Sequence, residues 1–100
     1  MSFIYFLEQP NGISISDEKP VVAKGSSSEI ECSASGFPIP EVSWYKDNVR
    51  VKNQVSESGR STLVLKDMDH NHAGLYACRA VNTIDGKMYK IEGYSIITGI

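Results

Sequence analysis

The sequence predicts an all-β fold in which two antiparallel sheets pack face to face. Short segments of alternating apolar and polar residues recur along its 100 residues, and turn-forming residues separate them. This pattern is typical of a β-sandwich. No long helix is expected.

The N-terminal segment predicts an edge strand with a break. The first strand is expected at residues 3–7. Pro10 offers no N–H to a strand ladder, and Asn11-Gly12 favours a turn, so we expect the strand to be interrupted there. Ile13 and Ile15 then resume strand pairing, and the last strand of the chain is their expected partner.

Alternation assigns the core positions of the middle of the chain. Residues 27–34 alternate, and the strand that follows does the same. The side chains expected to point inward are Ile30, Cys32, Ala34, Val42 and Trp44. The intervening Phe37-Pro38-Ile39-Pro40 is expected to be a stiff loop, because two prolines fix φ and extend the preceding residues.

The second half of the chain continues the same rhythm. Short edge segments are expected in residues 49–55, and Leu63 and Leu65 point inward from a strand at residues 61–65. A corner at residues 66–73 leads into a strand at residues 74–81. Asp85-Gly86 predicts a hairpin turn, which leads into the final strand at residues 87–97.

Two cysteines bracket a tryptophan, and a tyrosine stands two residues before the second cysteine: Cys32, Trp44, Tyr76 and Cys78. This combination resembles the immunoglobulin superfamily. Its finer pattern looks most like the intermediate (I-set) branch, over about residues 10–97. The segments that carry this likeness are Gly36-Phe37-Pro38-Ile39-Pro40, Val42-Ser43-Trp44-Tyr45-Lys46-Asp47, Leu63-Val64-Leu65, Tyr76-Ala77-Cys78 and Arg79-Ala80-Val81-Asn82.

The resemblance implies an immunoglobulin-like β-sandwich with Greek-key connections and a structural bridge between Cys32 and Cys78. Trp44 would pack on that bridge, Tyr76 would hold a corner of the chain, and Leu65 and Gly74 would complete the core signature. Sarcomeric I-set domains resemble this pattern and often keep the cysteines reduced, so the oxidation state stays open.

The charge balance argues against two classes of partner. Ten basic and twelve acidic residues give a net charge of −2, with no block of like charge. We therefore expect no nucleic-acid partner and no anionic membrane surface as partner. No apolar run reaches the length of a membrane span, so no membrane insertion is expected. The N-terminus lacks signal-peptide features, and residues 1–100 are expected to form a single module excised from a multi-domain protein.

Neither catalysis nor a metal site is predicted. No Gly-x-Ser-x-Gly elbow, phosphate loop, nucleophilic cysteine signature or paired-carboxylate arrangement occurs. Asp67-Met68-Asp69-His70-Asn71-His72 collects carboxylates and imidazoles, but it lacks zinc spacing and suits a polar corner. No cofactor is expected. His72 stands where the family commonly has an aspartate, and Arg60 is expected to face this histidine in place of the usual ion pair.

Two surfaces are candidates for protein binding. One is the outward face of the sheet that carries Trp44 and Cys78, with Ser43, Tyr45, Arg79, Val81, Met88 and Lys90. The other is one end of the sandwich, where residues 37–40 and 82–86 are expected to meet. The candidate binding residues are Phe37, Ile39, Tyr45, Arg79, Asp85 and Tyr89.

These observations favour a non-catalytic module of an extracellular adhesion or receptor protein. Its expected partners are neighbouring immunoglobulin-like modules and an adhesion or receptor ligand, with homophilic contact as a further option. The alternative is an intracellular module of a giant sarcomeric or cytoskeletal protein, acting as an elastic spacer or docking module. The chain has no Asn-x-Ser/Thr glycosylation site, which shifts weight slightly toward this alternative.

Overall fold

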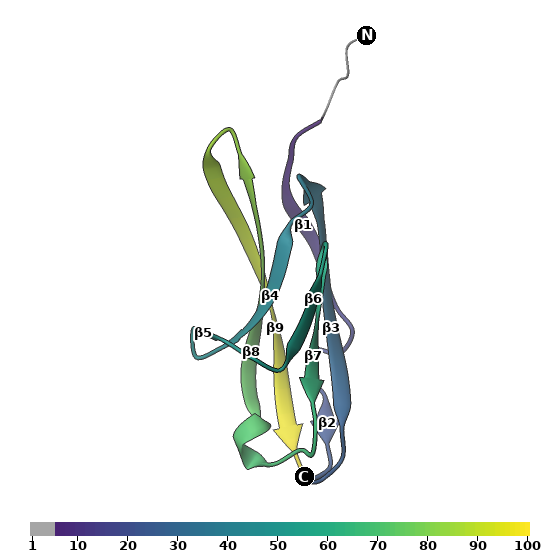
Figure 1. Cartoon of the computed structure of the whole chain (residues 1–100). Coiled ribbons are helices and arrows are strands. Elements are labelled where there is room, and N and C mark those ends of the chain that lie inside the picture. The colour runs from purple at the N-terminus through teal and green to yellow at the C-terminus, as the bar shows by residue number, and fades with distance from the viewer. Residues whose placement is uncertain (1–5) are drawn as a thin grey trace.

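Two β-sheets of mainly antiparallel strands pack face to face in the computed structural model, which describes residues 6–100 (Figure 1). The four-stranded sheet has the order β1 (Glu8–Ile15), β3 (Ser28–Phe37), β7 (Arg60–Leu65), β6 (Gln54–Glu57). The five-stranded sheet has the order β2 (Val21–Val22), β9 (Lys87–Gly99), β8 (Gly74–Ile84), β4 (Glu41–Lys46), β5 (Val49–Arg50). The predicted immunoglobulin-like β-sandwich is confirmed.

The strand complement lies between the two best-known forms of this sandwich. Constant-type domains have no strand beyond the equivalent of β4, whereas variable-type domains add two. Here β5 pairs with β4 only through Tyr45↔Arg50 and Lys46↔Val49, and it forms the sheet edge within the described residues. This intermediate complement agrees with the I-set likeness of the sequence.

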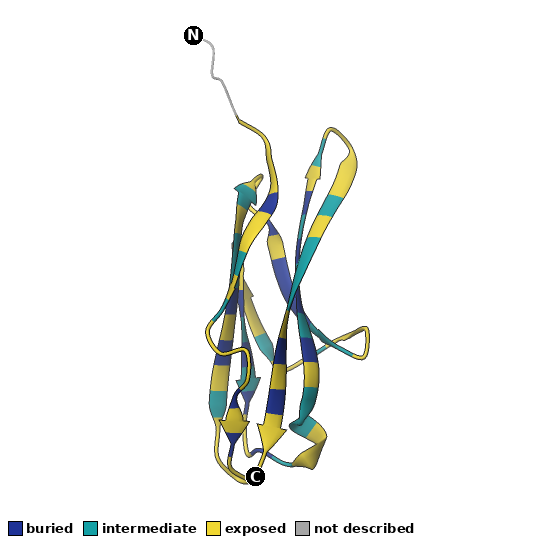
Figure 2. Cartoon of the chain, turned by 180° about the vertical axis from the view of Figure 1, so that it is seen from behind, coloured by how far each residue is buried: buried dark blue, intermediate teal, exposed yellow. Residues whose placement is uncertain are grey.

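The core lies between the sheets, and its members alternate with less buried residues along β3, β7 and β8 (Figure 2). The expected inward side chains are buried: Ile30, Cys32, Val42, Trp44, Leu63, Leu65, Tyr76 and Cys78. Ala34 packs partly buried against them. Alternation succeeded here because side chains of a strand point to opposite faces in turn.

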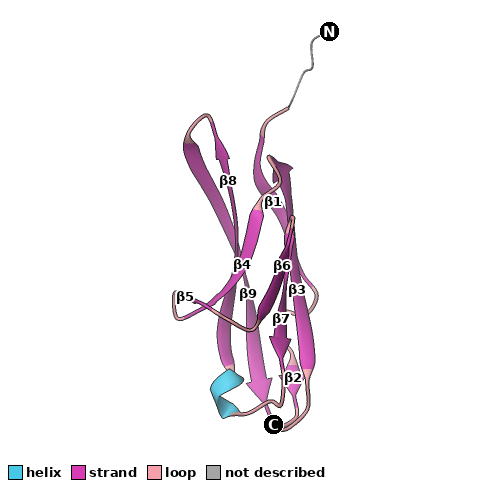
Figure 3. Cartoon of the chain, viewed as in Figure 1, coloured by secondary structure: helices cyan, strands magenta, loops and turns pink. Residues whose placement is uncertain are grey.

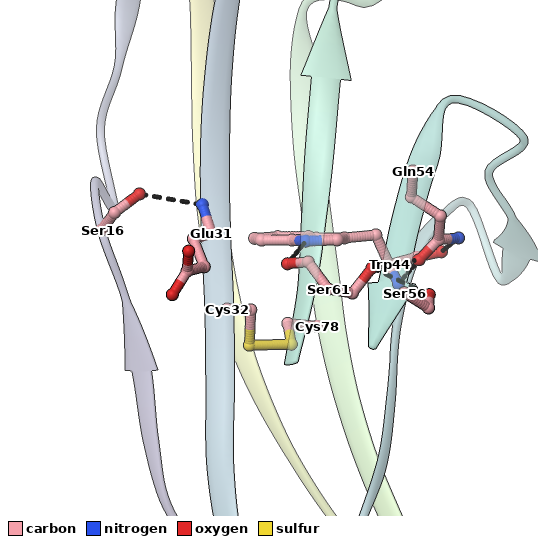
Figure 4. The surroundings of a disulfide bond; sticks show 8 residues. All are labelled: Ser16, Glu31, Cys32, Trp44, Gln54, Ser56, Ser61 and Cys78. Carbon is pink, nitrogen blue, oxygen red and sulfur yellow. Dashed lines mark hydrogen bonds between the residues drawn. A yellow bond between two sulfur atoms is a disulfide. The ribbon is translucent and has the colours of Figure 1, made fainter. Parts of the chain in front are cut away.

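A disulfide joins β3 to β8 at the centre of the core (Figure 4). The Cα atoms of Cys32 and Cys78 are 6.5 Å apart. The Trp44 indole lies over this bridge, and its Nε1–H donates to the Ser61 carbonyl oxygen at 3.0 Å. Gln54 ties the sheets together further, because its side-chain amide bonds both the N–H and the carbonyl of Trp44.

The N-terminal strand differs from the expectation. Residues 3–5 of the expected strand lie outside the described residues, and Phe6 and Leu7 precede β1. β1 runs through Pro10 because it is a sheet edge, where a missing N–H costs little. The expected turn at Asn11-Gly12 is wrong: Gly12 has φ 62° within an irregularity between Asn11 and Ser14, so its conformational freedom serves a bulge.

The expected partner of Ile13 and Ile15 is also wrong. Ile15 pairs with Cys32 of β3, whereas the last strand, β9, pairs in parallel with β2. The side chains of Ile13 and Ile15 do approach β9, but they do so across the sandwich at Gly93. The segment therefore faces the last strand by packing and not by strand pairing.

The corner before β8 contains the short 3₁₀ helix η1 (His70–His72), and the remaining described residues form strands and loops (Figure 3). The Asp69 carboxylate accepts from the Asn71 N–H, and His72 Nδ1 accepts from the Asp69 N–H at 3.0 Å. The expected placement of Arg60 opposite His72 is wrong, because Arg60 pairs instead with Glu57 at 3.1 Å and Glu31 at 3.9 Å. No helix within residues 6–100 is long and apolar enough to cross a membrane.

The C-terminal hairpin is confirmed and longer than expected. β8 extends to Ile84 and β9 to Gly99, and Ile84 pairs with Lys87 across the turn. Asp85 and Gly86 both have positive φ, 51° and 77°, as a two-residue hairpin turn of the primed type requires. The tip of this hairpin lies at the same end of the molecule as the β3–β4 loop (Figure 1).

Candidate protein-binding surfaces

Tyr45 and Arg79 meet on the outer face of the five-stranded sheet. Arg79 pairs with Ser43, and Tyr45 lies two residues farther along β4, so both side chains leave the same face. The Arg79 guanidinium carbon stands 4.2 Å from the centroid of the Tyr45 ring, which is cation–π distance. The sequence placed both residues on this face, and the structure brings them into contact.

A carboxylate on β9 fixes the other side of Arg79. Arg79 Nε lies 3.0 Å from Glu92 Oε1, and the Tyr94 hydroxyl donates to Glu92 Oε2 at 3.0 Å. The hydrogen bond from Tyr94 and the adjacent Arg79 lower the pKa of Glu92, and the same bond raises the pKa of Tyr94. The four side chains therefore form one ordered row across β4, β8 and β9.

Two shallow hollows flank this row. The first, about 310 Å³, lies toward the hairpin, and the second, about 220 Å³, lies toward the β4–β5 turn. The first is lined by Glu41, Ser43, Tyr45, Arg79, Val81, Met88 and Lys90. We call this lining set the Tyr45 face. Apart from Glu41 it consists of the outward residues that the sequence indicated, although Ser43 is buried.

The end surface is built around a buried asparagine. Asn82 Nδ2 donates to the carbonyl oxygens of Pro38 and Glu8, at 3.0 and 2.8 Å. This side chain joins β8 to the β3–β4 loop and to β1, so Asn82 has a structural role in the expected end site. Phe37, the last residue of β3, and Ile39, on the loop that follows, are 42% and 59% exposed.

Two candidate residues lie away from both clusters. Asp85 occupies the hairpin tip. Tyr89 pairs with the buried Asn82 and therefore points to the inner side of the hairpin, where Lys87 Nζ stands 5.3 Å from its ring centroid. Tyr89 thus belongs to the opposite face of the sheet from Tyr45 and Arg79.

The polar corner of residues 67–72 is engaged in its own structure. A carboxylate oxygen of Asp69 and an imidazole nitrogen of His72 accept the hydrogen bonds that cap η1. Within residues 6–100, no group of three or more His, Cys, Asp or Glu side chains is arranged to hold a metal ion.

One hollow was missed by sequence reasoning. It measures about 240 Å³ and lies beside η1 at the end opposite the hairpin, lined by Lys24, Met68, Asp69, His70, Ala73, Gly99 and Ile100. The one feature of the sequence that could have indicated this hollow is Met68, an apolar residue within an otherwise polar corner. Met68 is buried, and its carbonyl oxygen accepts from the Gly25 N–H.

Sequence comparison places the chain among known proteins. The immunoglobulin domain family matches residues 10–82. Hemicentin-2 of Mus musculus is 30% identical over 89 residues, covering 89% of this chain, and Zwei Ig domain protein zig-1 of Caenorhabditis elegans is 38% identical over 74 residues, covering 70%. The chain spans only 2% of hemicentin-2 and 28% of zig-1.

Solved structures share the fold. The Dpr2 Ig1-Ig2 complex with DIP-Theta Ig1-Ig3 aligns with a TM-score of 0.78 at 21% identity, over 94% of this chain and 33% of that one. Titin domain M7 aligns with a TM-score of 0.75 at 19% identity, over 96% of this chain and 98% of that one. Together with the sandwich, its central disulfide and the packed tryptophan, the sequence match shows that this chain belongs to the immunoglobulin domain family.

Proposed function

We propose that the chain is a non-catalytic protein-binding module of a cell-surface adhesion or receptor protein, and that it binds its partner through the Tyr45 face. The observation that carries this proposal is the fixed position of Arg79. Its guanidinium is held between the Tyr45 ring and the Glu92 carboxylate before any partner arrives.

Such preorganisation lowers the cost of binding. Ordering a long side chain at an interface costs about 0.5–1.5 kcal/mol, and an arginine already held in place loses less freedom. Tyrosine and arginine are also enriched among the residues that dominate binding energy. The neighbouring hollow, with exposed Met88 at its border, offers a partner side chain a partly apolar seat.

The extracellular assignment is supported by the disulfide between Cys32 and Cys78, because such bonds persist in oxidising compartments. The likeness to hemicentin-2 and to zig-1, and to a structure in which Dpr2 is complexed with DIP-Theta, supports a protein partner. Neighbouring modules of the same polypeptide would be further partners.

The alternative function is an intracellular sarcomeric or cytoskeletal module that acts as a spacer or docking unit. It is favoured by the fold likeness to titin domain M7, which this chain covers nearly end to end. Alkylation of the natural protein under denaturing conditions without reductant distinguishes the two. Cysteines that stay unlabelled indicate a closed bridge, and alkylated cysteines indicate a reducing compartment.

The binding test screens the folded module against a panel of cell-surface proteins and measures the affinity of any ligand for three variants. Tyr45→Ala should weaken binding by more than about 1 kcal/mol with little change in melting temperature, the behaviour of a hot spot. Val55→Ala, an exposed truncation on the other sheet, is the matched control and should leave affinity unchanged.

Phe37→Ala reports on the end surface. If this variant loses affinity while Tyr45→Ala does not, the binding site lies on the β3–β4 loop and the Tyr45 face is excluded. If no panel member binds the folded module, the spacer function replaces the proposal.

A further inference from the structure

The half of β9 nearest the hairpin turn is an open sheet edge. Alternate residues of an antiparallel strand direct their backbone N–H and C=O groups to opposite sides. The N–H groups of Ile96 and Thr98 point away from β8 and donate to the carbonyl oxygens of Glu18 and Pro20. By the same alternation, Met88, Lys90, Glu92 and Tyr94 direct their backbone groups to this side, where no backbone partner is found within residues 6–100.

The covering chain reaches only the C-terminal half of this edge. β2 pairs with Thr98 and Gly99, and the segment before it reaches as far as Ile96. Beyond that point the hairpin diverges from β1 and β3 (Figure 1). Between Met88 and Tyr94 the strand has no proline, the residue that most directly blocks pairing at an edge.

We propose that this edge pairs antiparallel with the same edge of a second copy of the chain, about a two-fold axis at Ile91. Lys90 of one copy then lies opposite Glu92 of the other, and Met88 lies opposite Tyr94, each contact occurring twice by symmetry. All four residues belong to the set whose backbone groups face the edge, so each of these pairs forms ladder hydrogen bonds.

Charge selects this register over its neighbours. A shift of the pairing by two residues in one direction places Lys90 opposite Lys90, and the shift in the other direction places Glu92 opposite Glu92. Like charges directly opposite one another destabilise a sheet, whereas opposite charges stabilise it. A shift by one residue would set edge-facing backbone groups against groups already bonded to β8.

Glu92 is suited to such a contact because it is already positioned. Arg79 holds one of its oxygens at 3.0 Å, and Lys90 of the same chain stands 3.9 Å from that oxygen. The Lys90 side chain is 60% exposed, so its ammonium can exchange this contact within the chain for one across a new ladder. The inference does not rest on the Tyr45 face as a ligand site, because the backbone of β9 carries it.

Sedimentation of the purified chain over a concentration series tests the proposal. A dimer is expected, and Lys90→Glu should raise its dissociation constant at least about tenfold, because the introduced carboxylate then lies opposite the carboxylate of Glu92. Lys66→Glu makes the same charge change at an exposed site outside β9 and should leave the constant unchanged. Lys90→Pro should also weaken the dimer, because it removes an edge N–H that β8 does not use.

Amide hydrogen exchange gives a second readout that a contact elsewhere would not produce. The amides of Met88, Lys90, Glu92 and Tyr94 should exchange rapidly in dilute solution and become protected at high concentration, while Tyr89 and Ile91 are protected throughout.

A chain that stays monomeric up to about 1 mM overturns the proposal, since that limit excludes all but the weakest association. A dimer that survives both Lys90 variants overturns it as well. So does a dimer that Tyr45→Ala abolishes while the four edge amides remain unprotected, because that result assigns self-association to the Tyr45 face.

Discussion

The Tyr76 hydroxyl donates a 2.7 Å hydrogen bond to the carbonyl oxygen of His72. Tyr76 is only 3% exposed, and the bond fixes the chain where η1 passes into β8. Burial raises the pKa of this phenol, with a further contribution from Asp47, so the hydroxyl remains a donor across the neutral range. Lys46 supports the same corner by donating to the carbonyl oxygens of Asn71 and Ala73.

Tyr76→Phe should lower the free energy of unfolding by about 1–3 kcal/mol, because the partly buried His72 carbonyl loses the hydrogen bond from the buried Tyr76 hydroxyl. Urea unfolding measures the change. Tyr94→Phe is the matched control: it removes a hydroxyl from a half-exposed residue and should cost less than about 0.5 kcal/mol. A Tyr76→Phe variant as stable as this control would show that the corner does not depend on the bond.

Removal of the disulfide should be among the largest single losses of stability. The bridge closes a loop of sequence separation 46. Loop closure of this length corresponds to about 4 kcal/mol of denatured-state entropy. The Cys32→Ala/Cys78→Ala double variant should therefore unfold at much lower urea concentration, or fail to fold. A loss below about 1 kcal/mol would contradict the chain-entropy argument for this protein.

Gly93 is a site where an added methyl group cannot be accommodated. A Cβ on Gly93 would lie 2.5 Å from Ile13 Cγ2 and 3.1 Å from Ile15 Cδ1. Gly93→Ala should therefore destabilise the fold by about 1–3 kcal/mol, as overpacking does, although alanine suits a strand better than glycine.

A double-mutant cycle with Ile13→Ala identifies the cause of this loss. With the Ile13 side chain truncated, the added methyl group has room, and Gly93→Ala should cost less than half as much. Equal costs in the two backgrounds would place the strain in the backbone of β9 and not at the contact with β1.

The row through Glu92 predicts a defined pH dependence. Because the pKa of Glu92 is lowered by folding, its stabilising contribution is complete above the ordinary value of 4.5 and disappears as the pH falls through the lower folded value. Because the pKa of Tyr94 is raised, the phenol's contribution is complete below 10.0 and is lost as the pH rises through the folded value.

Urea unfolding of the natural chain and of Glu92→Gln from pH 3 to pH 11 measures this dependence. The stability difference between the two proteins should be constant at intermediate pH and should shrink at both extremes. A difference that does not change between neutral pH and pH 3 would mean that the Glu92 carboxylate is not held by Tyr94 and Arg79 in solution.

The sequence by itself determined which side chains face the core. Apolar residues spaced two apart, such as Ile30 and Cys32 or Leu63 and Leu65, indicate the core-facing side of a strand, since successive side chains of a strand alternate. The hairpin at Asp85-Gly86 was equally readable, because its turn depends on two adjacent residues that tolerate positive φ. Of the two candidate surfaces, the Tyr45 face followed from the same alternation.

The tertiary structure alone decided which strands pair and which polar groups meet. Ile13 and Ile15 show their face in the sequence, but β3 and β9 both lie within their reach, and only long-range packing assigns pairing to β3. Arg60 was expected to face His72 by analogy, yet it pairs with Glu31 of the neighbouring strand β3. Alternation specifies a face and carries no information about the neighbouring strand or its register, so these contacts arise only when distant segments of the chain come together.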